Sequence, residues 1–448
     1  MTSRGAFGLN QYHSQQAFER DLPGATTRRP RRAVCARWGG AERPVMIQEG
    51  HSTKRSERGF TVVEMLIATT IMMTVTGAIF SILDPAQGMF KAQPEVSDMQ
   101  QRMRVGVDTL SKDLIMAGAG SYAGSSAGAL YNFFAPVLPY RSGDTTPDAP
   151  GSFFDNKVSI LYVPPTPSQT SIRDNMPNTA SQLKVNAQAN CPPDQQNALC
   201  GFKEGMRVVI FDQSGAFDPI TITSVQDAAL HIGYDGELSV AYSAGSKITQ
   251  IATHTYYLKE DAGTNTYQLM HYDGYQTDLP VVDNVVKLKF EYFGDPAPPQ
   301  LLPNVCLTAD CKGPWTTYGP KPPALGVNNA SDTWGAGENC TFQVVNGQHA
   351  PRLATLAAGV GQVKLNSTIF TDNTPMCPDG TKSERFDADL LRIRRVRISL
   401  RVQAALASLR GPAGLLFIRG GSSTTAERYV PDQELQFDVT PRNMNLGR

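Results

Sequence analysis

The chain has 448 residues, 41% of them hydrophobic, which is enough to bury a sizeable core and excludes a disordered protein. Its formal net charge is zero, but 11 of the 41 basic residues and 5 of the 41 acidic residues lie in residues 1–59. Residues 60–448 therefore have a net charge of −6 (30 basic minus 36 acidic), which does not favour nucleic acid as a partner. The 39 Gly and 31 Pro favour a loop-rich body with strands over a helical bundle.

The first predicted element is an apolar segment of 24 residues, 60–83, whose only charged side chain is Glu64. At ~1.5 Å of rise per residue, a helix of this length crosses a hydrocarbon core of ~30 Å. Three basic residues, Lys54, Arg55 and Arg58, come just before it. By the positive-inside rule, the N-terminus is predicted to be cytoplasmic and everything after the segment extracytoplasmic.

Two ordinary explanations of such a segment, a secretory signal and a plain signal anchor, do not fit this sequence. A secretory signal has a shorter apolar stretch and a small-residue cleavage site after it, whereas here the small residue, Gly59, comes before it. A plain signal anchor has no use for Glu64, because an unpaired carboxylate costs ~2.5 kcal/mol or more near the bilayer centre. The carboxylate therefore indicates a partner from another molecule.

The string RGFTVVEMLIA at 58–68 resembles the class III signal of type IV prepilins, in which a Gly is followed by a Phe, by apolar residues and by a Glu. The resemblance implies that a prepilin peptidase of the membrane cuts between Gly59 and Phe60 and methylates the new amino group. It also implies that Glu64 pairs with the N-terminal ammonium of a neighbouring subunit, so that both charges are neutralised in an apolar filament core. Glu64 would then act in assembly and not in catalysis.

Residues 1–59 form the predicted leader, which is longer than the leaders of this family usually are. Translation from Met46 would give a leader of 14 residues, so 1–45 are expected to be untranslated or disordered. The Arg-rich run TTRRPRR at 26–32 lies about thirty residues before the apolar segment, which argues against a twin-arginine export signal.

After the membrane segment, residues 84–120 are predicted to continue as an amphipathic helix, which Pro85 and Pro94 are expected to kink or interrupt. Beyond the prolines, apolar residues recur every three or four positions and predict one buried helical face that ends near Gly118. This stripe consists of Val96, Met99, Met103, Val107, Leu110 and Leu114.

From Asp155 onward the apolar period changes to two, which predicts strands and a mainly antiparallel sheet. The loop at 261–265 contains a Gly and separates two alternating runs, which are predicted to pair as a hairpin. The candidate strands are 157–163, 206–211, 220–225, 247–258, 267–272, 285–292, 396–404 and 435–439.

Six of the seven cysteines follow the membrane segment, and Cys35 precedes it. An even set on one side of a membrane indicates disulfides in an oxidising compartment; the connectivity stays open, and sequential pairing is favoured here. A metal site is not favoured, because the set contains no Cys-x-x-Cys and no clustered His. The disulfide candidates are Cys191, Cys200, Cys306, Cys311, Cys340 and Cys377.

No catalytic motif is found: the sequence has no nucleophile elbow, P-loop, zincin motif or dinucleotide turn, so no enzyme, metal or cofactor is predicted. His254 and His271 lie in the predicted hairpin and can face each other, but they are expected to be surface side chains rather than a ligand pair. A basic run invites a DNA-binding hypothesis, but its alternation predicts an edge or outer strand with a solvated charged face. The run consists of Arg392, Arg394, Arg395 and Arg397.

The order of the later segments resembles the PilW-type minor pilins and the J-type pseudopilins of type II secretion. Residues 296–387, which contain four of the cysteines, depart from that pattern. The resemblance implies an α+β pilin-like fold, in which a long N-terminal helix, half of it transmembrane, packs on a mainly antiparallel β-sheet domain at 121–448 with disulfide-bonded loop insertions. The matching segments are 103–120, 279–295, 395–402 and 440–447.

The predicted function is that of a minor pilin that primes assembly of, or caps, a type IV pilus. The mature chain of 389 residues (448 minus 59) is too large to resemble a small repeating major subunit. Its expected partners are the prepilin peptidase, other minor and major pilins or pseudopilins, and inner-membrane lipid. It would cross the bacterial inner membrane once and then enter a pilus or pseudopilus. The alternatives are a J-type pseudopilin and, from another class, a membrane-anchored surface adhesin or enzyme.

Overall fold

The computed structural model describes most of the chain after Arg58. The predicted leader with its start at Met46, and the cysteines Cys306 and Cys311, lie outside the described residues. The chain divides into two compact units, Met1–Ile71 and Met72–Arg448. The described residues are 59–120, 129–166, 168–188, 191, 197–261, 266–303, 315–329, 333–359, 361–371, 375–378, 384–424 and 426–445, without the side chains of 84–89 and 427.

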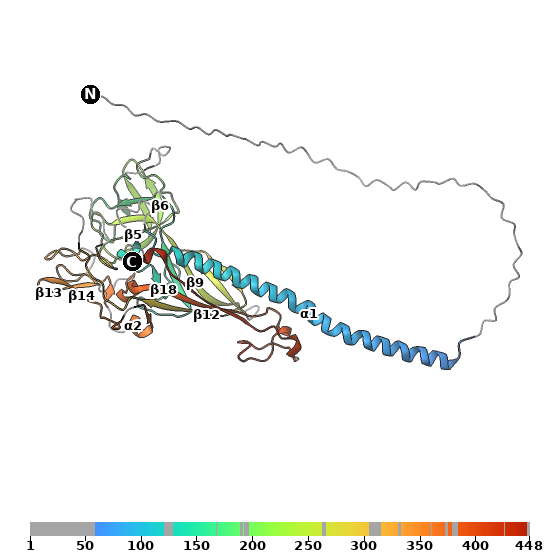
Figure 1. Ribbon diagram of the computed structural model, residues 1–448. Coiled ribbons are helices and arrows are strands. Elements are labelled where there is room, and N and C mark those ends of the chain that lie inside the picture. The colour runs from blue at the N-terminus through green and yellow to red at the C-terminus, as the bar shows by residue number, and fades with distance from the viewer. Residues whose placement is uncertain are drawn as a thin grey trace, which may run out of the picture. The chain divides into compact units, whose positions relative to one another are not determined.

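The long helix that the sequence predicts is α1, Val62–Met116, of 55 residues (Figure 1). It continues through Pro85 and Pro94, so the expected interruption is wrong. A proline removes one backbone hydrogen bond, and two such losses leave the rest of a ladder of this length intact. Beyond the helix, Gly118 has a φ of +74°, and its amide donates to the carbonyl of Leu161 at 3.0 Å, which turns the chain toward the sheet.

Two antiparallel sheets, of five and four strands, hold the predicted hairpin and the late strands. In the hairpin, β9 (Ala252–Asp261) and β10 (Thr266–Tyr272) pair with Thr266 opposite Asp261, so the predicted hairpin is confirmed. The five-stranded sheet has the order β1 (Val137–Leu138), β2 (Lys157–Tyr162), β9 (Ala252–Asp261), β10 (Thr266–Tyr272) and β11 (Asp278–Asp283). The four-stranded sheet has the order β15 (Val363–Leu365), β12 (Val285–Gly294), β18 (Ile393–Val402) and β19 (Gln433–Val439).

A third sheet, of six strands, has a hydrophobic core of its own. The prediction of a single strand at 247–258 is wrong, because β8 (Lys247–Gln250) belongs to this sheet and β9 to the five-stranded one. The division falls where the side chains change core, because Ile248 belongs to the core of the six-stranded sheet and Ile251 to the main core. The strand order is β3 (Gln169–Ser171), β8 (Lys247–Gln250), β5 (Arg207–Phe211), β6 (Phe217–Gln226), β7 (His231–Asp235) and β4 (Gln182–Lys184).

Short elements and two disulfides complete the described body. The structure joins Cys191 to Cys200 and Cys340 to Cys377, with Cα–Cα distances of 5.6 and 5.2 Å. The second bond, between Cys340 and Cys377, links two small hairpins. The small hairpins are β13 (Phe342–Val345) with β14 (Gln348–Pro351), and β16 (Met376–Cys377) with β17 (Phe386–Asp387). The remaining elements are α2 (Ser367–Thr371), η1 (Leu130–Asn132), η2 (Ala388–Arg392), η3 (Ala407–Leu409), η4 (Ala426–Arg428) and η5 (Arg442–Met444).

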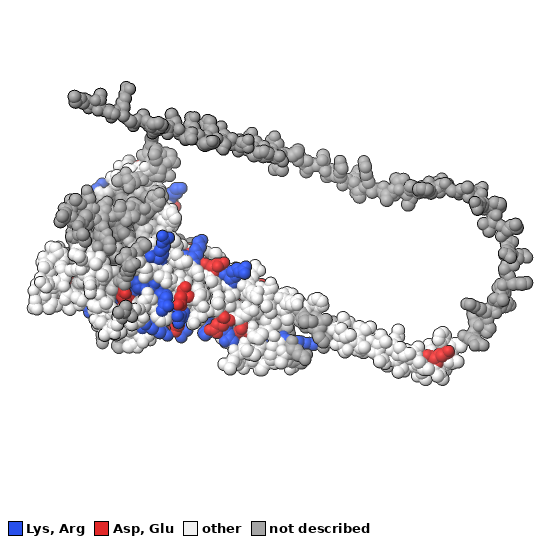
Figure 2. Space-filling view, viewed as in Figure 1, with Lys and Arg blue, Asp and Glu red and all other residues white. Residues whose placement is uncertain are grey.

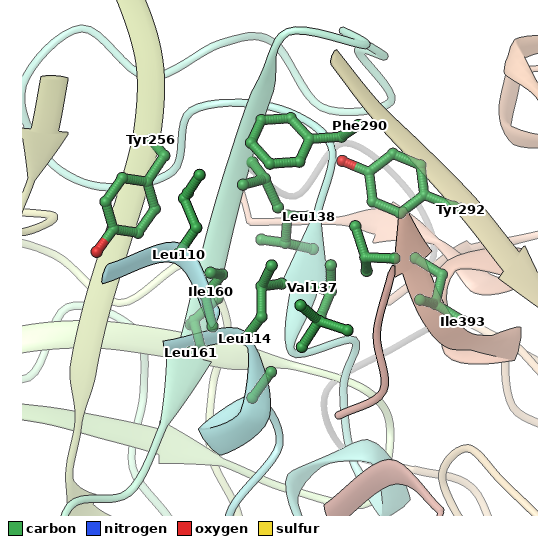
Figure 3. Packing of buried hydrophobic residues seen from close by; sticks show 14 of the residues in the cluster. Leu110, Leu114, Val137, Leu138, Ile160, Leu161, Tyr256, Phe290, Tyr292 and Ile393 are labelled. Carbon is green, nitrogen blue, oxygen red and sulfur yellow. The ribbon is translucent and has the colours of Figure 1, made fainter. Parts of the chain in front are cut away.

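The C-terminal half of α1 packs against the five- and four-stranded sheets and forms the main core. Figure 3 shows Leu110 and Leu114 of the helix facing the strand residues Ile160, Leu161 and Tyr256. Met99, Leu110 and Leu114 have no exposed surface, so the predicted buried stripe is confirmed. The approach is close, because a Cβ added at Gly106 would lie 2.7 Å from Cδ2 of Leu400.

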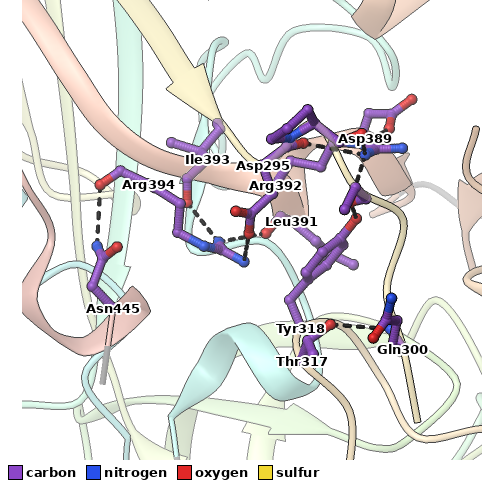
Figure 4. Close-up of polar contacts among 12 residues, drawn as sticks. Asp295, Gln300, Thr317, Tyr318, Asp389, Leu391, Arg392, Ile393, Arg394 and Asn445 are labelled. Carbon is purple, nitrogen blue, oxygen red and sulfur yellow. Dashed lines mark hydrogen bonds and ion pairs between the residues drawn. The ribbon is translucent and has the colours of Figure 1, made fainter. Parts of the chain in front are cut away.

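Strand β18 lies between β12 and β19, so the expected edge or outer strand is wrong. Arg392, just before β18, and Arg394 within it are 0% and 1% exposed (Figure 4). Burial is possible because Arg392 pairs with Asp389 and Arg394 with Asp295, the latter at 3.0 Å. The solvated face predicted for the basic run therefore holds only for its other members.

Those other members, Arg395 and Arg397, lie on the partly exposed face of the four-stranded sheet and both pair with Asp438, at 3.0 and 2.7 Å. Figure 2 shows basic and acidic side chains intermixed on the visible face of the body. Cross-strand ion pairs therefore account for these arginines without nucleic acid.

Candidate functional site

The first turn of α1 is closed by a capping box between Thr61 and Glu64. The amide of Thr61 donates to Oε2 of Glu64 at 2.9 Å, and the amide of Glu64 donates to Oγ1 of Thr61 at 3.3 Å. Each side chain satisfies a backbone donor that the helix start would leave without a partner. The T-x-x-E spacing is the sequence signal for this box, and the prediction that gives Glu64 a role in assembly alone overlooks it.

The predicted cleavage site lies just before this box. Gly59 and Phe60 precede the helix, and Phe60 is 83% exposed. A Cβ added at Gly59 would meet nothing within 4 Å. Both residues are exposed in the described part of the chain, so another molecule can reach the peptide bond between them.

The apolar stretch Val62–Leu83, of 22 residues, has a mean hydropathy of 2.0, and none of its residues is buried in the body. In the part of the chain that the structure describes, it is the one helical segment long and apolar enough to cross a membrane. Figure 2 shows it as white, with acidic atoms only near its N-terminal end. A core helix of a soluble protein would be mostly buried, so the exposure favours a lipid or protein environment outside this chain.

The same helix is held by the body from Glu95 onward. Glu95 is 8% exposed, and its Oε1 accepts a hydrogen bond from the amide of Ala405. Arg102 pairs with Asp98 one turn away and lies 3.8 Å from Oε1 of Glu95. These contacts add to the buried stripe, so α1 has an exposed apolar part and a packed amphipathic part.

A polar cluster lies between the last turn of α1 and the β9–β10 hairpin. Nδ1 of His254 lies 2.6 Å from Nε2 of His271 and 3.4 Å from Oδ2 of Asp113. Both histidines are half-buried, so the expectation of surface side chains is wrong. Burial lowers the pKa of both imidazoles, although Asp113 acts in the opposite direction.

An acidic cavity of about 420 Å³ lies beside the six-stranded sheet. Three of its lining carboxyls are Asp144, Asp218 and Glu384. Burial raises the pKa of Asp218, and burial together with Asp218 and Asp144 raises the pKa of Glu384 to about 7. The carboxyl of Asp218 accepts a hydrogen bond from the hydroxyl of Tyr242 at 3.0 Å, so this carboxyl already has a partner within the fold.

A comparison with protein families finds a match that covers the start of α1. The model of the prokaryotic N-terminal methylation motif matches residues 54–80. The match supports a type IV pilin-like protein that is processed by prepilin peptidase, is anchored in a membrane by its apolar helix and assembles with other pilins. Proteins with this motif are generally structural rather than enzymatic. No match to a curated protein or to a solved structure was found.

Proposed function

We propose that this chain is a minor pilin that primes or caps a type IV pilus. The observation that carries the proposal is the coincidence of the methylation motif with the start of α1. The helix exposes its apolar part, Val62–Leu83, and packs its later part into the body. An anchored subunit needs this division, because it must stand in lipid before assembly and among other helices afterwards.

Cleavage between Gly59 and Phe60 is compatible with the capping box. The box is made by Thr61 and Glu64, both of which lie after the cut. Removal of the leader thus leaves the first turn of the helix capped and adds an ammonium one residue before Thr61.

The carboxylate of Glu64 has capacity for a second partner. Within the described residues, its hydrogen bonds from Thr61 go to Oε2. A carboxylate accepts several hydrogen bonds, so Oε1 is suited to the ammonium of a neighbouring subunit. Glu64 would then cap its own helix and pair with the next one.

The body supports a place at an end of the filament. It contains two hydrophobic cores, and the mature chain would have 389 residues (448 minus 59). A subunit of this bulk is easier to place at a tip than in every repeat of a filament.

The first test is N-terminal sequencing and mass measurement of the protein from membranes with and without prepilin peptidase. We expect a chain that begins with N-methylated Phe60 only when the peptidase is present. A chain that keeps Gly59 in both strains contradicts the proposal. Deletion of the gene should then abolish piliation; loss of exoprotein secretion with intact pili would indicate a secretion pseudopilin instead.

A pair of variants separates the two roles of Glu64. Glu64→Gln keeps a capping-box side chain but removes the charge, whereas Thr61→Val removes the cap and keeps the charge. We expect Glu64→Gln to lose incorporation into pili and Thr61→Val to retain it, with normal membrane levels of both. The reverse result would show that the residue acts through helix capping alone.

A further inference from the structure

The last turn of α1 and the two strands of the β9–β10 hairpin, which follows much later in the chain, bring metal-ligating side chains together. Asp113 lies in the last turn of the helix, His254 in β9 and His271 in β10. His271 is opposite Tyr256 in the strand register, so His254 is its diagonal neighbour on the same face. The two imidazole rings stack with centroids 4.8 Å apart.

The donor atoms converge on one point. One nitrogen of each imidazole and one oxygen of Asp113 all lie within 4.8 Å of one another. In a tetrahedral zinc site with bonds of ~2.0–2.1 Å, ligand atoms stand ~3.3 Å apart. The 3.4 Å between Nδ1 of His254 and Oδ2 of Asp113 has this spacing. The 2.6 Å between the two histidine nitrogens has to open by about 0.7 Å.

A second layer of hydrogen bonds orients these ligands. The hydroxyl of Tyr162 lies 3.1 Å from Nε2 of His254 and donates to Oδ1 of Asp113 at 3.3 Å. The hydroxyl of Tyr256 donates to Oδ2 of Asp113. With Nε2–H of His254 directed at Tyr162, the lone pair of Nδ1 faces the cluster, as in metal sites whose histidines are fixed by an outer partner.

The charge of the cluster also calls for a cation. Asp113 is 6% exposed, and among the described residues its ion-pair partner is His254, which is charged only when protonated. Neutral imidazole is the form of histidine that binds a metal ion. A buried carboxylate with neutral partners is costly, and a divalent ion would supply the missing positive charge.

We propose that Asp113, His254 and His271 bind a divalent transition-metal ion of the zinc class, with a fourth position left to water. Imidazole and carboxylate ligands suit such an ion. The side chain of His254 is 21% exposed, which gives water and the ion a path. The bound ion would fasten the last turn of α1 to the β9–β10 hairpin. The alternative is that the two histidines share only an N–H···N hydrogen bond.

The test uses the full chain in detergent, stripped with a chelator and titrated with Zn²⁺ by calorimetry and thermal unfolding. We expect one tight site per chain and a rise in Tm of about 5 °C at a ~100-fold excess of Zn²⁺ over Kd. His271→Gln and Asp113→Asn should each weaken binding at least ~10-fold and remove the rise in Tm. His231→Gln in β7, outside the cluster, should behave as the wild type.

Two results would overturn the proposal. One is equal zinc binding by the wild type, His271→Gln and Asp113→Asn, which would place the ion elsewhere on the chain. The other is the absence of a tight site and of a zinc-dependent Tm in the wild type, which would leave the cluster as a hydrogen-bonded network. Because two variants probe the site, the failure of one of them to fold still leaves the comparison with His231→Gln.

Discussion

The buried guanidinium of Arg392 gives the sharpest prediction about what holds the body together. It pairs with Asp389, and it also donates to backbone carbonyls of two segments that precede it by many residues (Figure 4). Replacement by Met keeps an unbranched side chain in the core but removes every donor. The carbonyls are those of Asp295 (3.2 Å), Pro296 (3.4 Å), Ala297 (3.0 Å) and Ala354 (2.6 Å).

The expected loss follows from the partners that Arg392→Met leaves behind. A buried charge without its partner costs ~3–5 kcal/mol, and a buried acceptor without a donor ~1–3 kcal/mol. We therefore expect destabilisation of at least ~4 kcal/mol near pH 7. Burial already raises the pKa of Asp389 against the effect of Arg392, and loss of Arg392 should raise it further. A carboxyl whose pKa is raised in the folded state makes the folded protein less stable as the pH rises. The loss of stability in Arg392→Met should therefore be smaller at pH 5 than at pH 7.

The assay is chemical unfolding followed by the fluorescence of Trp315 and Trp334, which lie in the chain between the two segments whose carbonyls Arg392 binds. The control is Arg395→Met, whose side chain is 30% exposed and pairs with Asp438 on the outer face. A surface pair is worth ~0–1 kcal/mol, so this variant should stay within about 1 kcal/mol of the wild type. Equal stability of the two variants would refute the reasoning.

Two other predictions concern a close backbone approach and a titrating carboxyl. Gly143→Ala should destabilise by more than ~2 kcal/mol, because its φ is +117° and the new Cβ would lie 2.3 Å from the carbonyl oxygen of Gly274. Gly205→Ala, with a φ of +79° and open space around it, should cost only ~1 kcal/mol in the same unfolding assay. The pKa of Glu384 is raised to about 7, so the stability of the wild type should fall as the pH rises through this value. Glu384→Gln should be more stable than the wild type at pH 8, by at most ~3 kcal/mol, and equal to it at pH 4.

The elements that the sequence predicts well are those in which one periodic pattern meets one environment. The stripe from Met99 to Leu114 has the helical period and lies on one core, so both the helix and its buried face follow from the pattern. The strand prediction at 247–258 fails because the pattern of alternating residues carries no sign that Ile248 and Ile251 lie in different cores. Period alone indicates that a residue is buried, and not which core buries it.

The contacts of buried polar groups are not predicted from the sequence, for a related reason. A charged residue is assigned to the surface by default, and only the tertiary structure brings Arg392 beside the carbonyl of Asp295, 97 residues away. Asp113 and His254 likewise meet through the packing of α1 on the five-stranded sheet. The capping box differs, because Thr61 and Glu64 are three residues apart and their bond is local. The T-x-x-E spacing therefore signals a contact within one turn, whereas no spacing in the sequence signals side-chain partners that the fold brings together.

The first and last turns of α1 hold two carboxylates whose proposed roles are separable. Glu64 is exposed and is proposed to meet a neighbouring subunit, whereas Asp113 is buried and is proposed to meet a metal ion within the chain. Among the described residues they contact different partners, Thr61 for Glu64 and His254 for Asp113, so their substitutions should act independently. Asp113→Asn should therefore leave cleavage after Gly59 unchanged in the membrane, and Glu64→Gln should leave zinc affinity unchanged in detergent. If Asp113→Asn abolished cleavage, the packing of the body against α1 would have to affect the cleavage site. The proposed roles of Asp113 and Glu64 would then not be separable.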